Sequence, residues 1–219
     1  MAVLILGGTQ EARELARELG HDAILSLARD GGFGGPEGLK RYVAEHHVEA
    51  IVDATHPFAT RISASARDAG VPYLRLERPP FAPRAATYVD HLHEAELPDD
   101  ARVFLTTGHA EIDALAEHPA FFLVRALTPP KTLPPRHALI LARGPFTFAN
   151  ELRLIDEHRL THLVSKDSGG PDAKLRAAEQ RGLTIVLVRR PGKAGPSVAT
   201  VGEALRWVQD GASSSPRRN

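Results

Sequence analysis

The sequence of 219 residues contains no cysteine, which excludes disulfides, thiolate metal sites and a cysteine nucleophile. It also has no excess of charge, since 27 Lys and Arg residues balance 27 Asp and Glu residues. Without a net field no general attraction to nucleic acid is predicted, and any anion site must be a local cluster. No apolar run approaches the ~20 residues of a membrane span. The N-terminus lacks the basic segment and cleavage site of a signal peptide, so we expect a cytoplasmic protein with no membrane partner.

What is present is an alternation of short apolar runs with amphipathic segments around a proline-rich connector at residues 79–100. The runs predict strands at residues 3–6, 23–27, 49–54, 71–76, 102–107, 121–126, 138–142, 162–165 and 184–188. The amphipathic segments predict helices directly after the first strand and at residues 37–46, 57–69, 112–117, 148–158, 173–180 and 201–208. This rhythm is typical of parallel sheets. We predict an α/β protein of two Rossmann-like domains with mostly parallel sheets and a cleft between them: a dinucleotide-binding domain at 1–98, a substrate-side domain at 99–210 and a disordered tail at 211–219.

The first predicted turn is the clearest candidate site. The apolar run Val3–Leu6 reaches Gly7 and Gly8, and a helical pattern begins at once. A helix N-terminus offers backbone N–H groups and a positive dipole end, which suits a phosphate, and glycines let the backbone approach it closely. The third glycine of the G-x-G-x-x-G motif is missing. The alternative is an ordinary turn between a strand and a helix.

Two further strand ends in the first half carry polar groups. Arg29 follows the second strand, where an arginine accommodates the 2′-phosphate of NADP, although a solvated loop arginine fits the pattern equally well. Thr55 and His56 follow the third strand and can cap the next helix, in which Pro57 occupies the first turn. His56 is a candidate proton donor or a capping histidine, and Asp53 is interpreted as structural.

In the second half, cationic and small polar residues again follow strands. They comprise Thr107 and Gly108, Arg143 and Gly144, and the run Ser165-Lys166-Asp167-Ser168-Gly169-Gly170. The serine and glycines at a helix start can form an anion-binding nest. Converging cations indicate a ligand with several carboxylates or phosphates, whereas any single arginine could be an ordinary surface residue. The histidines match no standard metal spacing, so no metal is predicted.

Several motifs together resemble one known family, the precorrin-6A reductases or cobalt-precorrin-6A reductases of cobalamin biosynthesis. The matching blocks extend over almost the whole chain and are Leu6-Gly7-Gly8-Thr9-x-Glu11-Ala12, Gly31-Gly32-Phe33-Gly34-Gly35, Asp53-Ala54-Thr55-His56-Pro57-Phe58-Ala59, Leu76-Glu77-Arg78-Pro79, Arg143-Gly144-Pro145-Phe146 and Ser165-Lys166-Asp167-Ser168-Gly169-Gly170.

The resemblance implies an NADPH-dependent reduction of one double bond in a tetrapyrrole that bears acetate and propionate side chains. It implies a pyrophosphate site at Gly7, Gly8, Thr9, Gln10 and Glu11, an adenosine site near Ser26 and Arg29, and a nicotinamide site at Thr55, His56, Pro57 and Phe58. The macrocycle or its carboxylates would meet Arg143, Lys166, Ser168, Gly169 and Gly170, with Thr107, Gly108, Gly144 and Ser165 beside them. His56, Lys166 or water would deliver the proton. The protein is expected to be a monomer or small homo-oligomer.

Two departures from the family pattern bear on these expectations. Asp167 stands where the family usually has asparagine, and Ala28-Arg29-Asp30 runs straight into the glycines where the family usually has a longer segment. The short segment leaves both NADP and NAD as candidate cofactors. A short-chain-type oxidoreductase is a weaker alternative because no tyrosine has a lysine four residues on, and a dinucleotide-binding sensor would leave the second-half cations without a purpose.

Overall fold

The computed structural model describes residues 1–27, 33–82, 84–109 and 112–212. The chain forms two compact units, one of Met1–Pro79 with Pro191–Asn219 and the other of Pro80–Arg190. This division differs from the expected boundary at residue 98. The chain returns to the first unit after Arg190, and the connector contains a strand that belongs to the second unit.

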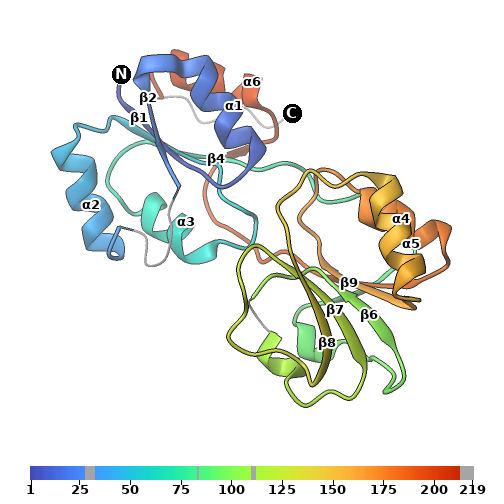
Figure 1. The fold of residues 1–219 in the computed structure, drawn as a ribbon. Helices are drawn as coiled ribbons and strands as arrows, with labels where there is room; N and C mark the ends of the chain where they lie inside the picture. Colours follow the sequence, from blue (N-terminus) through green and yellow to red (C-terminus); the bar gives the residue numbers. More distant parts are fainter. Residues whose placement is uncertain (28–32, 83, 110–111, 213–219) are drawn as a thin grey trace. The chain divides into compact units, whose positions relative to one another are not determined.

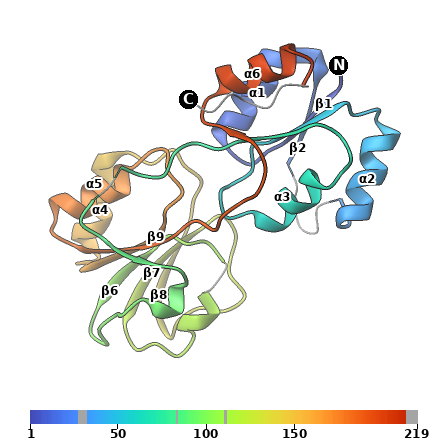
Figure 2. The same ribbon diagram turned by 180° about the vertical axis from the view of Figure 1, so that it is seen from behind.

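The first unit is built on a five-stranded parallel sheet in the order β11-β4-β3-β1-β2. Its strands are β1 (Val3–Leu6), β2 (Ala23–Ser26), β3 (Ala50–Asp53), β4 (Tyr73–Leu76) and β11 (Ser197–Val198). Its helices are α1 (Gln10–Leu19), the 3₁₀ helix η1 (Gly20–Asp22), α2 (Pro36–Glu45), α3 (Thr60–Arg67) and α6 (Val201–Gln209). Helices α1 and α6 lie on one face of the sheet and α2 and α3 on the other (Figure 1, Figure 2).

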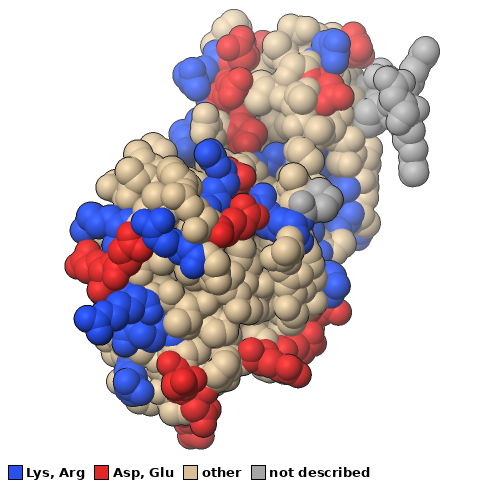
Figure 3. All heavy atoms as spheres, turned by 90° about the vertical axis from the view of Figure 1, so that its right-hand side faces the viewer, with Lys and Arg blue, Asp and Glu red and all other residues tan. Residues whose placement is uncertain are grey.

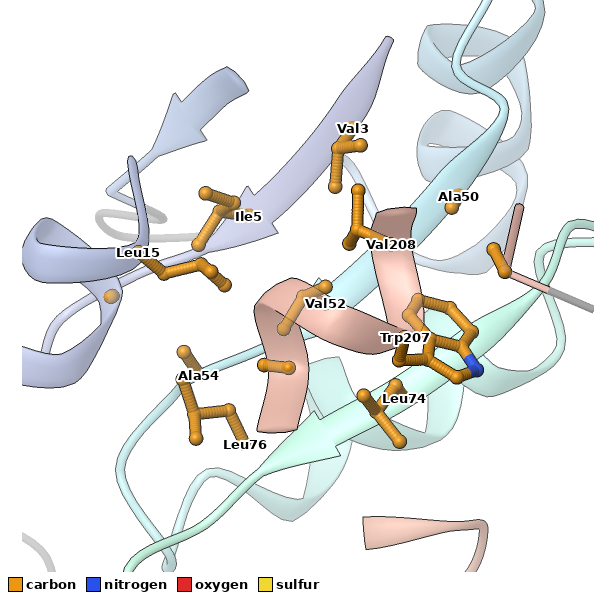
Figure 4. Close-up of a cluster of buried hydrophobic side chains, with 13 residues drawn as sticks. Val3, Ile5, Leu15, Ala50, Val52, Ala54, Leu74, Leu76, Trp207 and Val208 are labelled. Carbon is orange, nitrogen blue, oxygen red and sulfur yellow. The ribbon is translucent and has the colours of Figure 1, made fainter. Parts of the chain in front are cut away.

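Alternation of side chains along β1 explains why both faces are covered. Val3 and Ile5 join the cluster under α1 and α6, whereas Leu4 and Leu6 join the cluster under α2 and α3. Successive residues of a strand point to opposite faces, so an unbroken apolar run requires a helix layer on each side. Figure 4 shows Trp207 of α6 among the side chains of the first cluster.

The second unit is built on a six-stranded parallel sheet in the order β5-β10-β9-β6-β7-β8. Its strands are β5 (Thr87–Val89), β6 (Arg102–Leu105), β7 (Phe121–Ala126), β8 (Arg136–Leu141), β9 (His162–Lys166) and β10 (Thr184–Val188). Its helices are η2 (Leu92–Glu94), η3 (Ile112–Leu115), α4 (Phe148–Glu157) and α5 (Ala173–Gln180). Helices α4 and α5 pack on the cluster that contains Phe104, Leu163 and Leu187. The predicted α/β class with parallel sheets is confirmed for both units.

Three local predictions were wrong or only partly right. The helix expected from Pro57 begins at Thr60 and has Ala59 as its N-cap, without a side-chain cap. The helix expected at 112–117 is a single 3₁₀ turn. The tail expected to be disordered from 211 includes Ala212, which is buried against the core of the first unit; its remainder, 213–219, lies outside the described residues.

Charged side chains of both signs are interspersed on the face drawn in Figure 3. Among the described residues, no helix has the length and apolar character needed to cross a membrane.

Candidate functional site

The strand order of the first unit places two loops at one edge of the sheet. β1 lies between β2 and β3, so the chain leaves β1 toward one side of the sheet and continues from β3 toward the other. Such a switch point is where open α/β sheets bind ligands. The turns after the two strands are joined there, because the Thr9 hydroxyl donates a hydrogen bond to the Ala54 carbonyl oxygen at 2.8 Å.

The turn after β1 has the backbone that its glycines predicted. Gly8 adopts a φ of 125°, which is strained for any residue with a Cβ. A Cβ on Gly7 would lie 3.2 Å from the Ser26 carbonyl oxygen and 2.9 Å from a Leu25 methyl. Thr9 is the N-cap of α1 and accepts a hydrogen bond from the Ala12 N–H. The two glycines and the Thr9 cap therefore lead directly into α1, a helix of 10 residues that begins at Gln10.

Glu11 has a partner that the sequence did not reveal. Its carboxylate pairs with the Arg78 guanidinium at 3.3 Å. A free carboxylate at this position would repel a phosphate, and the ion pair balances that charge. Arg78 belongs to the Leu76–Pro79 motif, in which nothing local indicated its role.

The adenosine end of the expected site is only partly described. Ser26 ends β2, and its carbonyl oxygen accepts a hydrogen bond from the Gly7 N–H at 2.8 Å. Leu25 and Leu27 on either side of it are exposed. Arg29 lies outside the described residues, as do Gly31 and Gly32 of the glycine-rich motif, so the phosphate-reading role stays a prediction.

Asp53 at the end of β3 is the centre of a buried polar network. Its carboxylate accepts hydrogen bonds from the Thr55 hydroxyl at 2.6 Å, the Thr55 N–H at 3.1 Å and the Tyr73 hydroxyl at 2.9 Å. Burial, together with the adjacent Asp53 charge, raises the pKa of Tyr73 well above its usual value, so the phenol stays a neutral donor. The structural interpretation of Asp53 is confirmed.

Lys193 completes this network from a distant part of the sequence. Its ammonium lies 3.9 Å from the Asp53 carboxylate, and the two side chains are 4% and 1% exposed. It donates hydrogen bonds to the Thr55 hydroxyl at 3.2 Å and the His56 carbonyl oxygen at 3.1 Å. The lysine thus holds the turn after β3, and no motif in the sequence marked it.

His56 does not cap the following helix. Its side chain is exposed, and its Nδ1 accepts a hydrogen bond from the Phe58 N–H at 3.3 Å. In a neutral ring this arrangement leaves the proton on Nε2. Pro57 is buried, and the rings of His56 and Phe58 lie 5.7 Å apart. His56 therefore presents a donor nitrogen at the same edge as the turn after β1.

The second unit has its own switch point, between β6 and β9. The chain moves from β6 through β7 to β8 on one side, then crosses to β9 and β10 on the other. The Thr106 N–H donates a hydrogen bond to the Val164 carbonyl oxygen at 2.9 Å, which joins the two strand ends. Thr107 and Gly108 follow β6, Ser165 and Lys166 are the last residues of β9, and residues 167–170 follow β9, so the structure brings the expected residues to one edge.

The loop after β9 is not the helix start that the sequence suggested. Gly169 and Gly170 have φ values of 65° and 80°, and α5 begins only at Ala173. Lys166 ends β9, and its carbonyl oxygen accepts a hydrogen bond from the Ser168 N–H at 2.8 Å. The two left-handed glycines make a loop that residues with a Cβ would resist.

Three side chains near this loop differ in what they offer a ligand. Ser165 is fully buried. Asp167 accepts a hydrogen bond from the Phe81 N–H at 3.0 Å, a contact that the asparagine of the family pattern could also make. Thr107 is 5% exposed, and its hydroxyl has no hydrogen-bond partner within the described part of the chain. A buried hydroxyl without a partner is costly, which makes Thr107 a candidate ligand contact.

The loop after β8 carries Arg143 and Gly144, which are exposed at the same end of the sheet. Further along this loop, the ring of Phe146 lies under the Arg125 guanidinium, with 3.7 Å between the guanidinium carbon and the ring centroid. Arg125 in turn pairs with Glu151 at 2.6 Å. Neither residue of this pair was singled out from the sequence.

No group of three or more His, Asp or Glu side chains is arranged to hold a metal ion in the described ranges.

Comparisons with known proteins agree on one family. The family model described as precorrin-6x reductase CbiJ/CobK matches residues 26–209. The chain is 44% identical to a precorrin-6A reductase from Rhodococcus erythropolis, over 94% of this chain and 96% of the relative. It is 42% identical to a precorrin-6A reductase from Mycobacterium tuberculosis, with the same coverage. The solved structure of a CobK precorrin-6A reductase is 36% identical, covers all of both chains and superposes with a TM-score of 0.89.

Proposed function

The chain belongs to the precorrin-6x reductase CbiJ/CobK family, and on that basis we propose that it reduces precorrin-6A with NADPH in cobalamin biosynthesis. Membership makes it a reductase of a corrin-ring precursor. The choice of NADPH and the residue roles go beyond what family membership establishes, and they rest on the strand ends at the two switch points. Since both relatives named above act on precorrin-6A, we favour the cobalt-free substrate over cobalt-precorrin-6A.

The first unit fits a dinucleotide. The turn after β1 leaves no room for a Cβ on Gly7 and holds Gly8 at a φ that favours glycine. Backbone that passes directly over a helix N-terminus suits a pyrophosphate. Gly7, Gly8 and Thr9, with the first residues of α1, would hold that group, and Thr55–Phe58 would lie near the nicotinamide.

The second unit fits an anionic substrate. Lys166 ends β9 and Arg143 follows β8 in one parallel sheet. The buried Thr107 follows β6, which lies between these two strands in the order of the sheet. Two cations and a donor at one edge suit a molecule that carries several carboxylates. Ser168, Gly169 and Gly170 would let the loop approach the macrocycle closely.

The reaction adds a hydride to one carbon and a proton to the other carbon of one C=C bond of the ring. NADPH, when bound, supplies the hydride. The protein orients the two reactants and supplies positive charge for the carboxylates. His56 through Nε2, Lys166 through its ammonium, or water would place the proton on the neighbouring carbon.

Cofactor choice gives the first test of this function. We expect titration of the purified protein, followed by nicotinamide fluorescence, to show tighter binding of NADPH than of NADH. In Arg29→Ala the preference for NADPH over NADH should fall at least about tenfold, because roughly one charge-assisted hydrogen bond to the 2′-phosphate is lost. Equal binding of the two cofactors by the wild type would remove the role of Arg29 and keep the reductase. Binding of neither would overturn the cofactor site.

Lys166→Ala tests the substrate side. We expect the variant to lower kcat/KM for precorrin-6A by about tenfold to a hundredfold, because a cation that meets the macrocycle is lost. The dissociation constant for NADPH should not change. Lys131→Ala removes an exposed lysine from a loop of the same unit and serves as the control. Wild-type kinetics in Lys166→Ala would remove this residue from the site.

A further inference from the structure

A buried ion pair in the second unit lies outside the residues assigned so far. Arg125 of β7 and Glu151 of α4 form a contact of 2.6 Å, with side chains 6% and 1% exposed. The second carboxylate oxygen of Glu151 has no hydrogen-bond partner among the described residues. A buried pair of this kind, with one oxygen unsatisfied, is a poor source of stability, since apolar residues of similar size often serve as well. The pair is therefore better explained by what it holds in place.

The guanidinium of Arg125 lies over two aromatic rings. Its central carbon is 4.8 Å from the ring centroid of Phe104 in β6 and 3.7 Å from that of Phe146. Phe104 is 1% exposed and belongs to the core of the unit, so one side of the stack is fixed. Phe146 belongs to the loop between β8 and α4. The ion pair therefore fastens this loop to the centre of the sheet.

Glu151 is suited to orient the guanidinium. It lies in the first turn of α4, where the helix dipole favours a carboxylate. Helix α4 begins after Thr147, whose hydroxyl accepts a hydrogen bond from the Asn150 N–H at 3.3 Å. Glu151 thus reaches Arg125 from a capped helix end that directly follows the loop. Both members of the ion pair that holds Phe146 are therefore anchored in regular structure, Arg125 in β7 and Glu151 in α4.

We propose that Arg125 and Glu151 are positioning residues for the substrate, because they clamp Phe146 and so fix the loop that presents Arg143. The proposal rests on the proposed function. Arg143 is exposed, and only two residues separate it from the clamped ring. A cation that must meet a carboxylate of a rigid macrocycle gains from being held in one place, because a side chain that has to be ordered on binding weakens the binding of the substrate.

The test uses Arg125→Met/Glu151→Leu, which removes both charges and leaves no buried ion alone. We expect the KM for precorrin-6A to rise about tenfold, with kcat and the dissociation constant for NADPH within about twofold of wild type. Arg125→Lys keeps a charge for Glu151 but loses the planar stack on Phe146, so its KM should stay raised. The matched control is Arg153→Met/Glu157→Leu, an exposed pair on the same helix, which should leave KM unchanged.

A cycle with Arg143→Ala separates positioning from general stability. If the pair acts through Arg143, adding Arg125→Met/Glu151→Leu to Arg143→Ala should raise KM no further. Fully additive increases, or a wild-type KM in Arg125→Met/Glu151→Leu, would overturn the proposal.

Hydrogen exchange of the backbone amides of residues 143, 144, 146 and 147 provides a readout that does not depend on the reaction. We expect faster exchange there in Arg125→Met/Glu151→Leu than in wild type, and no change in the Arg153→Met/Glu157→Leu control. Unchanged exchange would overturn the clamp even if the protein proved inactive toward precorrin-6A. An inactive wild type with the expected exchange would instead refute the proposed function alone.

Discussion

Lys193→Met is expected to lower the free energy of unfolding of the first unit by about 3 kcal/mol, because it leaves the Asp53 carboxylate buried without its cation. The side chain of Lys193 is 4% exposed and that of Asp53 is 1% exposed. The change also removes hydrogen bonds to the Thr55 hydroxyl and the His56 carbonyl oxygen, which loosens the turn expected near the nicotinamide. Urea denaturation measures the first effect, and the dissociation constant for NADPH, which should rise, measures the second.

A second substitution shows whether the buried charge is the cause. In Lys193→Met/Asp53→Asn an uncharged amide replaces the carboxylate, so much of the lost free energy of unfolding should return. Lys40→Met breaks an exposed pair with Glu37 and should change the stability far less than Lys193→Met does, because exposed ion pairs contribute little. If Lys193→Met proved no more damaging than Lys40→Met, the network around Asp53 would not be the anchor of this turn.

Gly8→Ala is expected to weaken NADPH binding by at least about tenfold, which corresponds to ~1.4 kcal/mol. Gly8 has a φ of 125°, a conformation that costs a residue with a Cβ about 1–3 kcal/mol. A chain that relaxes to negative φ rotates the peptide groups of the turn, and the backbone no longer faces the N-terminus of α1. Nicotinamide fluorescence titration provides the measurement.

Gly202→Ala is the matched control for this prediction. Gly202 lies in α6 with ordinary φ, and a Cβ there would meet nothing within 4 Å. Alanine in a helix interior is favoured over glycine by up to about 1 kcal/mol, so the variant should bind NADPH normally and be slightly more stable. Equal binding by Gly8→Ala and wild type would show that the turn after β1 does not hold the cofactor.

Much of this fold follows from short stretches of sequence. The apolar run Val3–Leu6 followed by two glycines predicts a buried strand and a turn, since each depends on residues a few positions apart. The alternation of strands and helices likewise predicts parallel sheets. The strand ends at Thr55 and Lys166 were located from the sequence for the same reason, because in each case an apolar run stops at polar residues.

Other features depend on residues far apart in the chain. Strand β5 lies in a proline-rich connector and pairs with β10, and β11 returns to β4 after the whole second unit. Such short strands carry almost no apolar signal, so only pairing with a distant neighbour defines them, and with them the domain boundaries.

The features of this protein therefore fall into two groups, those set by local sequence and those set by contacts between distant residues. The sequence by itself determined the α/β class, the glycine turn after β1 and the strand ends that carry polar residues, because these depend on local patterns. Only the tertiary structure decided that Lys193 meets Asp53, that Arg78 meets Glu11 and that Arg125 clamps Phe146. A buried charge is tolerated only where folding brings it a partner, and a partner more than a hundred residues away, as Lys193 is from Thr55, leaves no trace in the local pattern.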